Sequence, residues 1–192
     1  MHTPKLSLPR IEGVKLNSTY EVVEFLETQL AYAHKAQDTS RMYALDCNGW
    51  LPLHHALRDN ATLGAIIKLL VKGNRSALTV IDNLGATPLH IACTYSSAGV
   101  VEYLLEVDDR LLHHCDQKKN SVLHNACQGG NCEVVKLLIE RNVPSVSERN
   151  TDNKLPIQLL LESVEHQVDH NSPEYIEAIW LLLLTYPSVL NT

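Results

Sequence analysis

The chain has 192 residues and a formal net charge of −6, and its composition is 45% hydrophobic but only 5% aromatic. The hydrophobic fraction excludes a largely disordered chain, and the acidic balance leaves no broad basic surface for direct nucleic-acid binding. The longest apolar run, from Ala178 to Leu184, is far shorter than the ~20 residues that a membrane span needs. No membrane contact is therefore expected.

Cysteine usage and the start of the chain predict the cellular compartment. The five cysteines are an odd number and form no C-x-x-C pair. Lys5 and Arg10 interrupt the first residues, so no apolar segment of a secretory signal follows Met1. Both features favour a reducing compartment, and we expect a cytoplasmic or nuclear protein.

The N-terminal segment is expected to differ from the rest of the chain. Residues 1–17 are predicted to be irregular or loosely packed. Residues 18–45 are predicted to form a partial capping unit, because the segment VVEFLE at 22–27 resembles helical segments further along the chain. Ser18 or Thr19 would cap its helix.

The rest of the chain is built from a recurring signature. The form D-x-x-G-x-T-P-L-H-x-A occupies Asp82 to Ala92 almost intact. Degraded copies begin at Asp46, Asp116 and Asn150, so successive copies start 36, 34 and 34 residues apart. A fixed period in this range predicts a solenoid, in which each unit buries its apolar face against its neighbours. The predicted units are 46–81, 82–115, 116–149 and 150–192.

The second copy predicts a turn followed by two helices. Gly85 can adopt the positive φ that the turn needs. The Thr87 hydroxyl can cap the next helix, and Pro88 suits the first helical position. The first helix is expected over 88–95 and the second over 98–107. The other copies repeat the apolar stripe of the second helix.

The last unit is expected to be atypical, because the polar stretch 162–173 separates its helices. Its final helix, 174–185, is apolar nearly all round, so it is expected to be buried, Trp180 included. The terminal unit of a solenoid normally presents a polar outer face. The polar stretch, another repeat, a second chain or a partner would cover this apolar end, and self-association through it is one hypothesis. A strictly monomeric protein without dye-binding apolar surface would contradict that hypothesis.

These residues and their spacing resemble the ankyrin repeat over Asp46 to Leu190, with the partial unit before it. The resemblance implies an all-α fold, an α-solenoid of stacked helix-turn-helix repeats joined by short β-turn or hairpin fingers. In the family, the histidine of TPLH is structural and hydrogen-bonds within and between repeats. By motif position this role carries over to His54, His90 and His124.

Departures from the family pattern fall mainly at the ends of the array. Gln158 replaces the histidine in the fourth unit, so its bonding must differ. Leu51 and Leu155 stand in place of the capping threonine, and a lost helix cap costs ~1 kcal/mol. The first and last units are therefore expected to be the weaker ones.

The resemblance also places a binding surface, because in ankyrin repeats the finger tips and the first helices line a concave groove. The residues at those positions are mixed in charge, which suits a protein surface better than a phosphate backbone. The predicted protein-binding residues are Asn48, Trp50, His55, Arg58, Asp59, Asn83, Leu84, Ala86, Thr94, Tyr95, Gln117, Lys118, Asn120, Gln128, Asp152 and Lys154.

Trp50 has two interpretations. Trp, Tyr and Arg are enriched in interface hot spots, and Trp50, Tyr95 and Arg58 all lie on the predicted groove. In the other interpretation, Trp50 packs on the partial N-terminal unit or on a neighbouring finger. Its loss would then lower the thermal stability sharply.

The sequence therefore predicts a non-catalytic protein–protein interaction module, which is an adaptor, scaffold or inhibitor. It contains no G-x-S-x-G, P-loop, G-x-G-x-x-G or H-E-x-x-H motif, and no cofactor is expected.

Two alternatives remain at this point. One is a metal-binding or enzymatic protein that uses His113, His114 and Cys115, although adjacent residues of an extended chain point to opposite faces and the spacing matches no zinc motif. Metal analysis of the purified protein would test it. The other is a regulator of transcription or ubiquitination that acts through a bound partner.

Overall fold

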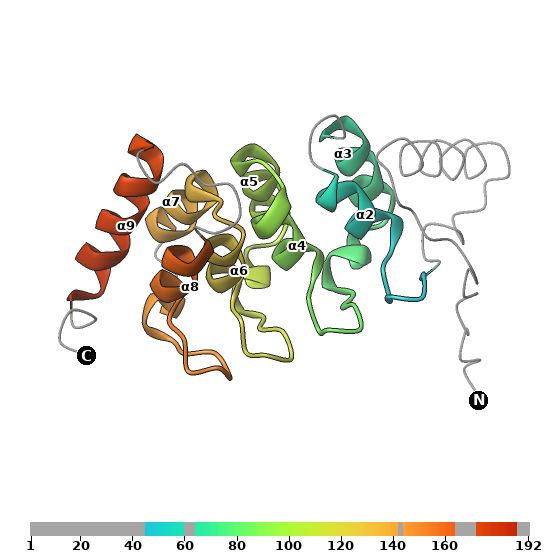
Figure 1. The fold of residues 1–192 in the computed structure, drawn as a ribbon. Coiled ribbons are helices and arrows are strands. Elements are labelled where there is room, and N and C mark those ends of the chain that lie inside the picture. The colour runs from blue at the N-terminus through green and yellow to red at the C-terminus, as the bar shows by residue number, and fades with distance from the viewer. Residues whose placement is uncertain (1–44, 60–63, 142–143, 164–171, 188–192) are drawn as a thin grey trace, which may run out of the picture.

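The computed structural model describes residues 45–59, 64–141, 144–163 and 172–187. The predicted irregular segment 1–17 lies outside these residues, as do nearly all of the predicted capping unit 18–45 and most of the polar stretch 162–173. In the described part, helix pairs follow one another in sequence order along a single elongated row (Figure 1). This arrangement confirms the predicted all-α solenoid.

Each unit contributes a first helix, which follows its finger, and a second helix, which packs on the first. The first helices are α2 (Pro52–Arg58), α4 (Pro88–Tyr95), α6 (Val122–Gln128) and α8 (Pro156–Glu162). The second helices are α3 (Gly64–Gly73), α5 (Ala98–Val107), α7 (Cys132–Glu140) and α9 (Pro173–Thr185). The bounds predicted for α4 and α5 are confirmed. None of the described helices has the length and apolarity needed to cross a membrane.

Short 3₁₀ helices, which the sequence pattern does not predict, connect the second helices to the next fingers. They are η2 (Arg75–Thr79), η3 (Asp109–His113) and η4 (Pro144–Ser147). Leu78 in η2 and Leu111 in η3 are buried. The tight turns therefore return an apolar side chain to the core within a connecting segment.

Packing between like helices holds the row together. α4 packs against both α2 and α6, and α6 packs against α8, so the first helices form one continuous layer. α7 packs against α5 and α9 in the second layer. Leu89, Leu104, Leu123 and Leu138 are fully buried in the shared core. Burial of each such side chain contributes about 1.5–3 kcal/mol relative to exposure.

One side chain organises each finger. In every finger, Oδ1 of the first residue accepts two hydrogen bonds of 2.8–3.0 Å. The donors are the backbone N–H groups two and four residues further along the chain. The backbone N–H of the same residue donates to the carbonyl of the fourth following residue at 2.9–3.0 Å. The residues that hold this first position are Asp46, Asp82, Asp116 and Asn150. These bonds satisfy the backbone of a surface loop from within.

The fourth residue of each finger adopts a positive φ, as predicted for Gly85, whose φ is +77°. Gly49 has a φ of +78° at the same position of the first finger. Lys119 and Asn153 adopt φ values of +57° and +60° in the third and fourth fingers. Because a side chain disfavours this region, the surrounding hydrogen bonds must hold these two residues there.

Neighbouring fingers are joined through their backbones, and all project on the same side of the helix layers (Figure 1). One backbone–backbone hydrogen bond of 2.8–3.0 Å joins each pair of neighbouring fingers. The N–H groups of Asn83, Gln117 and Thr151 donate to the carbonyls of Asn48, Leu84 and Lys118, respectively. Among the described residues the only β pairing is an isolated bridge between Cys115 and Ser121.

The histidine of the second unit makes the hydrogen bonds that the resemblance implies. The backbone N–H of Thr87 donates to Nδ1 of the buried His90 at 3.2 Å, and its Nε2 lies 3.2 Å from the carbonyl oxygen of Asn120 in the next unit. Because an N–H only donates and a carbonyl only accepts, the ring is neutral with its proton on Nε2. His124 bonds in the same way to Ser121 and to the carbonyl of the fourth unit.

The helix caps differ from the prediction. The Thr87 hydroxyl lies 2.8 Å from Nδ1 of His90 and makes no hydrogen bond to the helix backbone, so it supports the ring instead. Leu51 and Leu155, which lack a hydroxyl, are buried in the core. The N–H of Leu155 donates to Oε1 of Gln158 at 2.8 Å. Gln158 therefore replaces the hydrogen bond that histidine makes within the repeat.

The free energy of unfolding is predicted to fall at acid pH, because Nδ1 of each buried histidine accepts a backbone N–H. Protonation of Nδ1 would place a second N–H against this donor. Burial lowers the pKa of His54 from 6.5 to about 4, and it lowers the pKa of His90 and His124 as well. Stability is therefore full above pH 6.5 and is lost as the pH falls from 6.5 towards 4. For His54 alone the loss is about 3 kcal/mol, measurable by urea unfolding across this range.

His54→Gln is the matched control for this prediction. Gln158 shows that an amide oxygen accepts the N–H at this position, and an amide does not titrate. The variant should lose less stability than the wild type on acidification. An equal loss in both proteins would show that His54 is not the responsible group.

Candidate functional site

The surface formed by the fingers and the first helices is named the finger face here, and it carries most of the predicted contact residues. Their accessibility divides them into two groups. The exposed residues are Asn48, Arg58, Asn83, Leu84, Tyr95, Gln117, Lys118, Gln128 and Asp152. The half-buried residues are Trp50, His55, Asp59, Thr94 and Lys154. The finger face extends over all four units.

Two predicted contact residues, Ala86 and Asn120, are buried, with only 5% and 6% of their surfaces exposed. They hold the last position of their fingers, where the chain turns inward to begin the first helix. The Asn120 amide donates to Oδ2 of Asp116 at 2.9 Å, and its Oδ1 accepts the amide of Asn150 at 2.9 Å. The expectation that this position is accessible is therefore wrong for both residues. They support the finger face from below.

Trp50 holds the first finger against the second. Its indole N–H donates to Oδ2 of Asp82 at 3.0 Å, across the boundary between the units. Its ring stacks on His54 with 6.2 Å between centroids and meets His55 edge-on at 5.1 Å. Trp50 thus packs on a neighbouring finger, as one of its two interpretations predicts, while part of its surface stays accessible.

Arg58 lies against two aromatic rings from different repeats. Its guanidinium carbon is 5.4 Å from the centroid of the Trp50 ring and 5.9 Å from that of Tyr95. Both distances are within the range of cation–π attraction. Tyr95 is the last residue of α4 and is 46% exposed. These three residues are named the aromatic–arginine cluster.

His55 and Asp59 flank this cluster on α2 and at its end. Nε2 of His55 lies 3.1 Å from Oδ2 of Asp46, so the ring is directed towards the first finger. Burial lowers the pKa of His55 despite the neighbouring Asp46 carboxylate. The backbone N–H of Asp59 closes α2 by donating to the His55 carbonyl at 3.2 Å. His55 is thus held by the first finger, and Asp59 is held by the end of α2.

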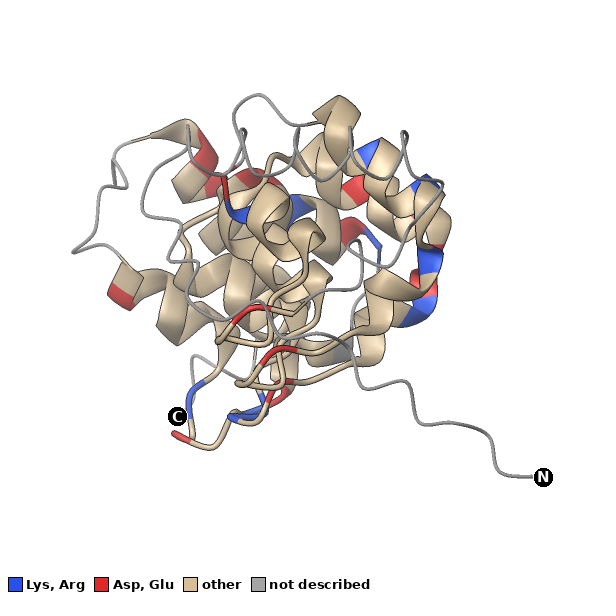
Figure 2. Ribbon diagram, turned by 90° about the vertical axis from the view of Figure 1, so that its right-hand side faces the viewer, with Lys and Arg blue, Asp and Glu red and all other residues tan. Residues whose placement is uncertain are grey.

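The C-terminal half of the finger face carries more charge than the N-terminal half. Lys118 and Lys119 are exposed at the third finger, and Lys154 pairs with Glu162 at 2.5 Å on the fourth. Figure 2 looks along the row and shows basic and acidic residues close together on the fingers. The finger face therefore offers both signs of charge rather than a basic track.

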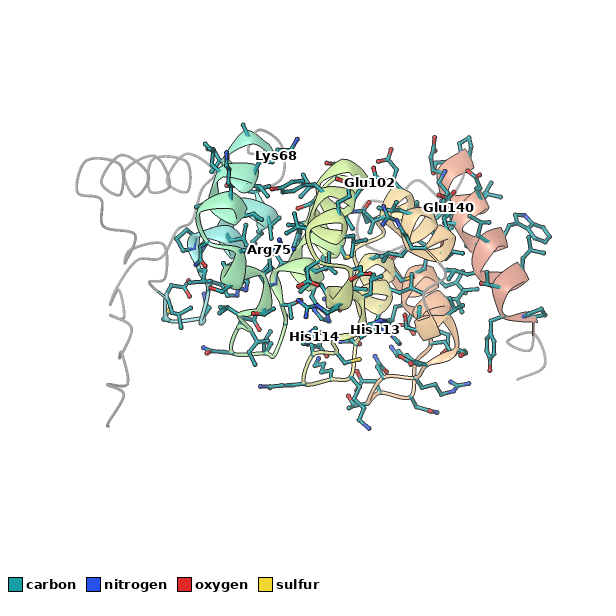
Figure 3. The ribbon with its side chains drawn as sticks, turned by 180° about the vertical axis from the view of Figure 1, so that it is seen from behind. Lys68, Arg75, Glu102, His113, His114 and Glu140 are labelled. Carbon is teal, nitrogen blue, oxygen red and sulfur yellow. The ribbon has the colours of Figure 1, made fainter. Side chains whose placement is uncertain are left out.

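The proposed metal ligands lie away from the finger tips. His113 ends η3 and His114 follows it, and both are exposed (Figure 3). Cys115 is also exposed, and its backbone pairs with Ser121. Within the described ranges, no group of three or more His, Cys, Asp or Glu side chains is arranged to hold a metal ion. The metal-binding alternative stays a prediction without a geometry that supports it.

The outer face of α9 departs from the prediction that the helix is buried. Trp180 is 60% exposed, and Ile176 and Leu184, one turn away on either side, are 46% and 70% exposed. The spacing of four residues places the three side chains on one face. α9 packs on α7, and its buried residues, Ala178 and Leu182 among them, alternate with the exposed ones. Self-association through this exposed stripe stays a prediction.

Asp82 and Glu162 are among the residues that support the finger face but are missing from the predicted set. Asp82 anchors the indole of Trp50, and its recurrence at the first position of the signature was a usable signal. Glu162 pairs with Lys154 eight residues earlier, and no sequence pattern indicates this pair. The contact between the end of α8 and the fourth finger depends on how the chain folds back within the unit.

Comparison with known families gives two matches to this chain. The family model described as "Ankyrin repeats (3 copies)" matches residues 14–110. The model described as "Ankyrin repeat" matches residues 118–147.

Several curated proteins are similar to part of the chain. SMC5-SMC6 complex localization factor protein 1 of Bos taurus is 34% identical over 120 residues, which is 60% of this chain and 11% of that protein. The transient receptor potential cation channel subfamily A member 1 homolog of Caenorhabditis elegans is 33% identical over 57% of this chain and 9% of its own length. Ankyrin repeat and SOCS box protein 11 of Pongo abelii is 30% identical over 56% of this chain and 32% of its own length. The chain thus spans only a minor part of each relative.

Trp50→Ala is predicted to lower the free energy of unfolding by about 2 kcal/mol, because it removes a half-buried ring and leaves the Asp82 carboxylate oxygen without its indole donor. Trp50→Phe keeps an aromatic ring but loses the N–H, so about half of the loss should remain. Urea unfolding of the purified variants measures both values.

Tyr95→Ala is the control for this prediction, since Tyr95 is aromatic, exposed and on the same face. It should change the free energy of unfolding by no more than about 0.5 kcal/mol. An unchanged stability of Trp50→Ala would contradict the packing role and would leave Trp50 as a free surface residue.

Proposed function

Because the chain belongs to the ankyrin repeat family, we propose that it is a non-catalytic interaction module that binds another protein across its finger face. The aromatic–arginine cluster is the observation that supports this proposal most strongly. Trp, Tyr and Arg are the residue types most enriched in interface hot spots. Here Arg58 contacts both the Trp50 ring and the Tyr95 ring on the finger face.

The construction of the fingers also supports a binding role. Their backbone groups are satisfied by internal hydrogen bonds, so the side chains at the tips are available for a partner. Those side chains include an exposed Leu84, amides such as Asn83 and Gln117, and the charged Lys118 and Asp152. A mixture of apolar, amide and charged groups is typical of protein interfaces.

The role proposed for the module is that of an adaptor, scaffold or inhibitor. The relatives carry unrelated names, among them a complex localization factor and a cation channel homolog, so the shared repeats indicate a way of binding rather than a shared partner. Regulation of transcription or of ubiquitination through such a partner is compatible with this role. An intracellular location, cytoplasmic or nuclear, belongs to the proposal and is consistent with five free cysteines.

The test is an affinity capture from a lysate of the source cells, read by quantitative mass spectrometry. We expect the wild-type chain to retain proteins that the double variant Arg58→Ala/Tyr95→Ala loses. Both side chains are exposed, so their truncation should leave the unfolding temperature nearly unchanged. Trp50 is left in place because it packs between the fingers.

The matched control removes one arginine and one exposed apolar side chain outside the finger face, as Arg110→Ala/Leu69→Ala on η3 and α3. This variant should retain the same proteins as the wild type. The proposal fails if all three proteins retain the same set, or if the wild type retains nothing specific.

A further inference from the structure

Arg58 differs from the other arginines of the described ranges in having no hydrogen-bond acceptor. Two of the others are paired with carboxylates, Arg110 with Asp108 and Arg141 with Glu102. Arg75 and Arg149 donate to the backbone carbonyls of Val107 and Asn153. For Arg58, by contrast, the contacts in the described structure are the faces of the Trp50 and Tyr95 rings. Its N–H donors are therefore free to bind an external group.

The carboxylates of Asp46 and Asp82, in the first two fingers, accept hydrogen bonds from groups other than Arg58. Both carboxylate oxygens of Asp46 accept hydrogen bonds, from backbone N–H groups and from His55. Those of Asp82 accept the N–H groups of its own finger and the indole of Trp50. No ion pair joins Asp59 to Arg58 among the described residues. The two finger carboxylates thus support the finger face, and no carboxylate of the described residues pairs with the Arg58 guanidinium.

The two rings make Arg58 a prepared anchor rather than a loose surface cation. Contact with two aromatic faces restricts the rotamers of a long side chain before any partner binds, which reduces the entropy lost on binding. A guanidinium stacked by its face keeps its edge donors available in a fixed fork. That fork matches the two oxygens of a carboxylate.

We propose that Arg58 is the anchor for an Asp or Glu side chain of the bound partner protein, with the neighbouring part of the partner's chain lying on the exposed ring of Tyr95. This inference rests on the proposed function and specifies its partner as a protein segment with an acidic residue next to an apolar one. A nucleic-acid backbone fits less well, because it needs several free cations in a row and the finger face mixes both signs of charge.

The probe for the test is a library of random peptides displayed on phage and selected on the full chain. Selected peptides are then synthesised, and their affinities are measured by fluorescence anisotropy for the wild type, Arg58→Gln, Arg58→Lys, Tyr95→Ala and Arg110→Gln. Arg110→Gln removes one exposed positive charge from η3 and controls for net charge. Thermal unfolding confirms that each variant is folded.

The expected result is a shared Asp or Glu in the selected peptides. Its replacement by Asn or Gln should weaken binding to the wild type by about tenfold or more, while binding to Arg58→Gln changes less than about twofold. Arg58→Lys keeps the positive charge but loses the forked pair of donors, so its affinity for the peptides should lie between those of the wild type and Arg58→Gln. Arg110→Gln should bind like the wild type.

The other outcomes separate the inference from the proposed function. Peptides that lose affinity for Tyr95→Ala but carry no shared acidic residue would show that Arg58 is not the anchor. The same holds if replacing the acidic residue weakens binding equally for the wild type and Arg58→Gln. In both cases the proposed function stands. If no peptide is selected, or if Tyr95→Ala and Arg58→Gln both bind like the wild type, the inference fails together with the finger face as a binding site.

Discussion

The side-chain oxygen at the start of each finger is the interaction on which the rest of the structure depends. It accepts two backbone N–H groups and so closes the turn from within. The second oxygen of each aspartate accepts a different donor, namely His55 at Asp46, the indole of Trp50 at Asp82 and the Asn120 amide at Asp116. Each of these carboxylates thus closes the turn of its own finger and also holds a neighbouring side chain in place. Asn150 fills the role without a charge, which shows that an acceptor suffices.

This support gives a surface made of loops the rigidity that the proposed binding site requires. The inter-finger hydrogen bonds fix each finger relative to the next, and His90 and His124 add a bond to the third and the fourth finger, respectively. Side chains on such a face are held in place before a partner arrives, so less ordering is required on binding. The aromatic–arginine cluster shows the same principle at the level of three residues, because Arg58 is positioned by rings from two different repeats.

Much of this structure could be predicted because it recurs along the sequence. The signature at Asp82 to Ala92 located α4 and α5, since Pro88 and the break after Tyr95 are local signals. Ala86 was wrongly placed on the surface, because the repeat pattern does not show that the last finger residue turns inward. Trp180 was wrongly expected to be buried, because apolar periodicity cannot show which neighbours a terminal helix has. The contacts of Arg58 could not be predicted from the sequence, since the rings of Trp50 and Tyr95 that it touches belong to separate repeats.

The central claim is that the fingers are held rigid by these first-position side chains, and amide hydrogen exchange measured by NMR on the free protein tests it most directly. The N–H groups of Leu84 and Ala86, which donate to Asp82, should exchange at least about a hundredfold more slowly than in an unstructured chain. In Asp82→Ala they should approach the unstructured rate while α6 and α7 stay protected. Unprotected Leu84 and Ala86 amides in the wild type would contradict the claim.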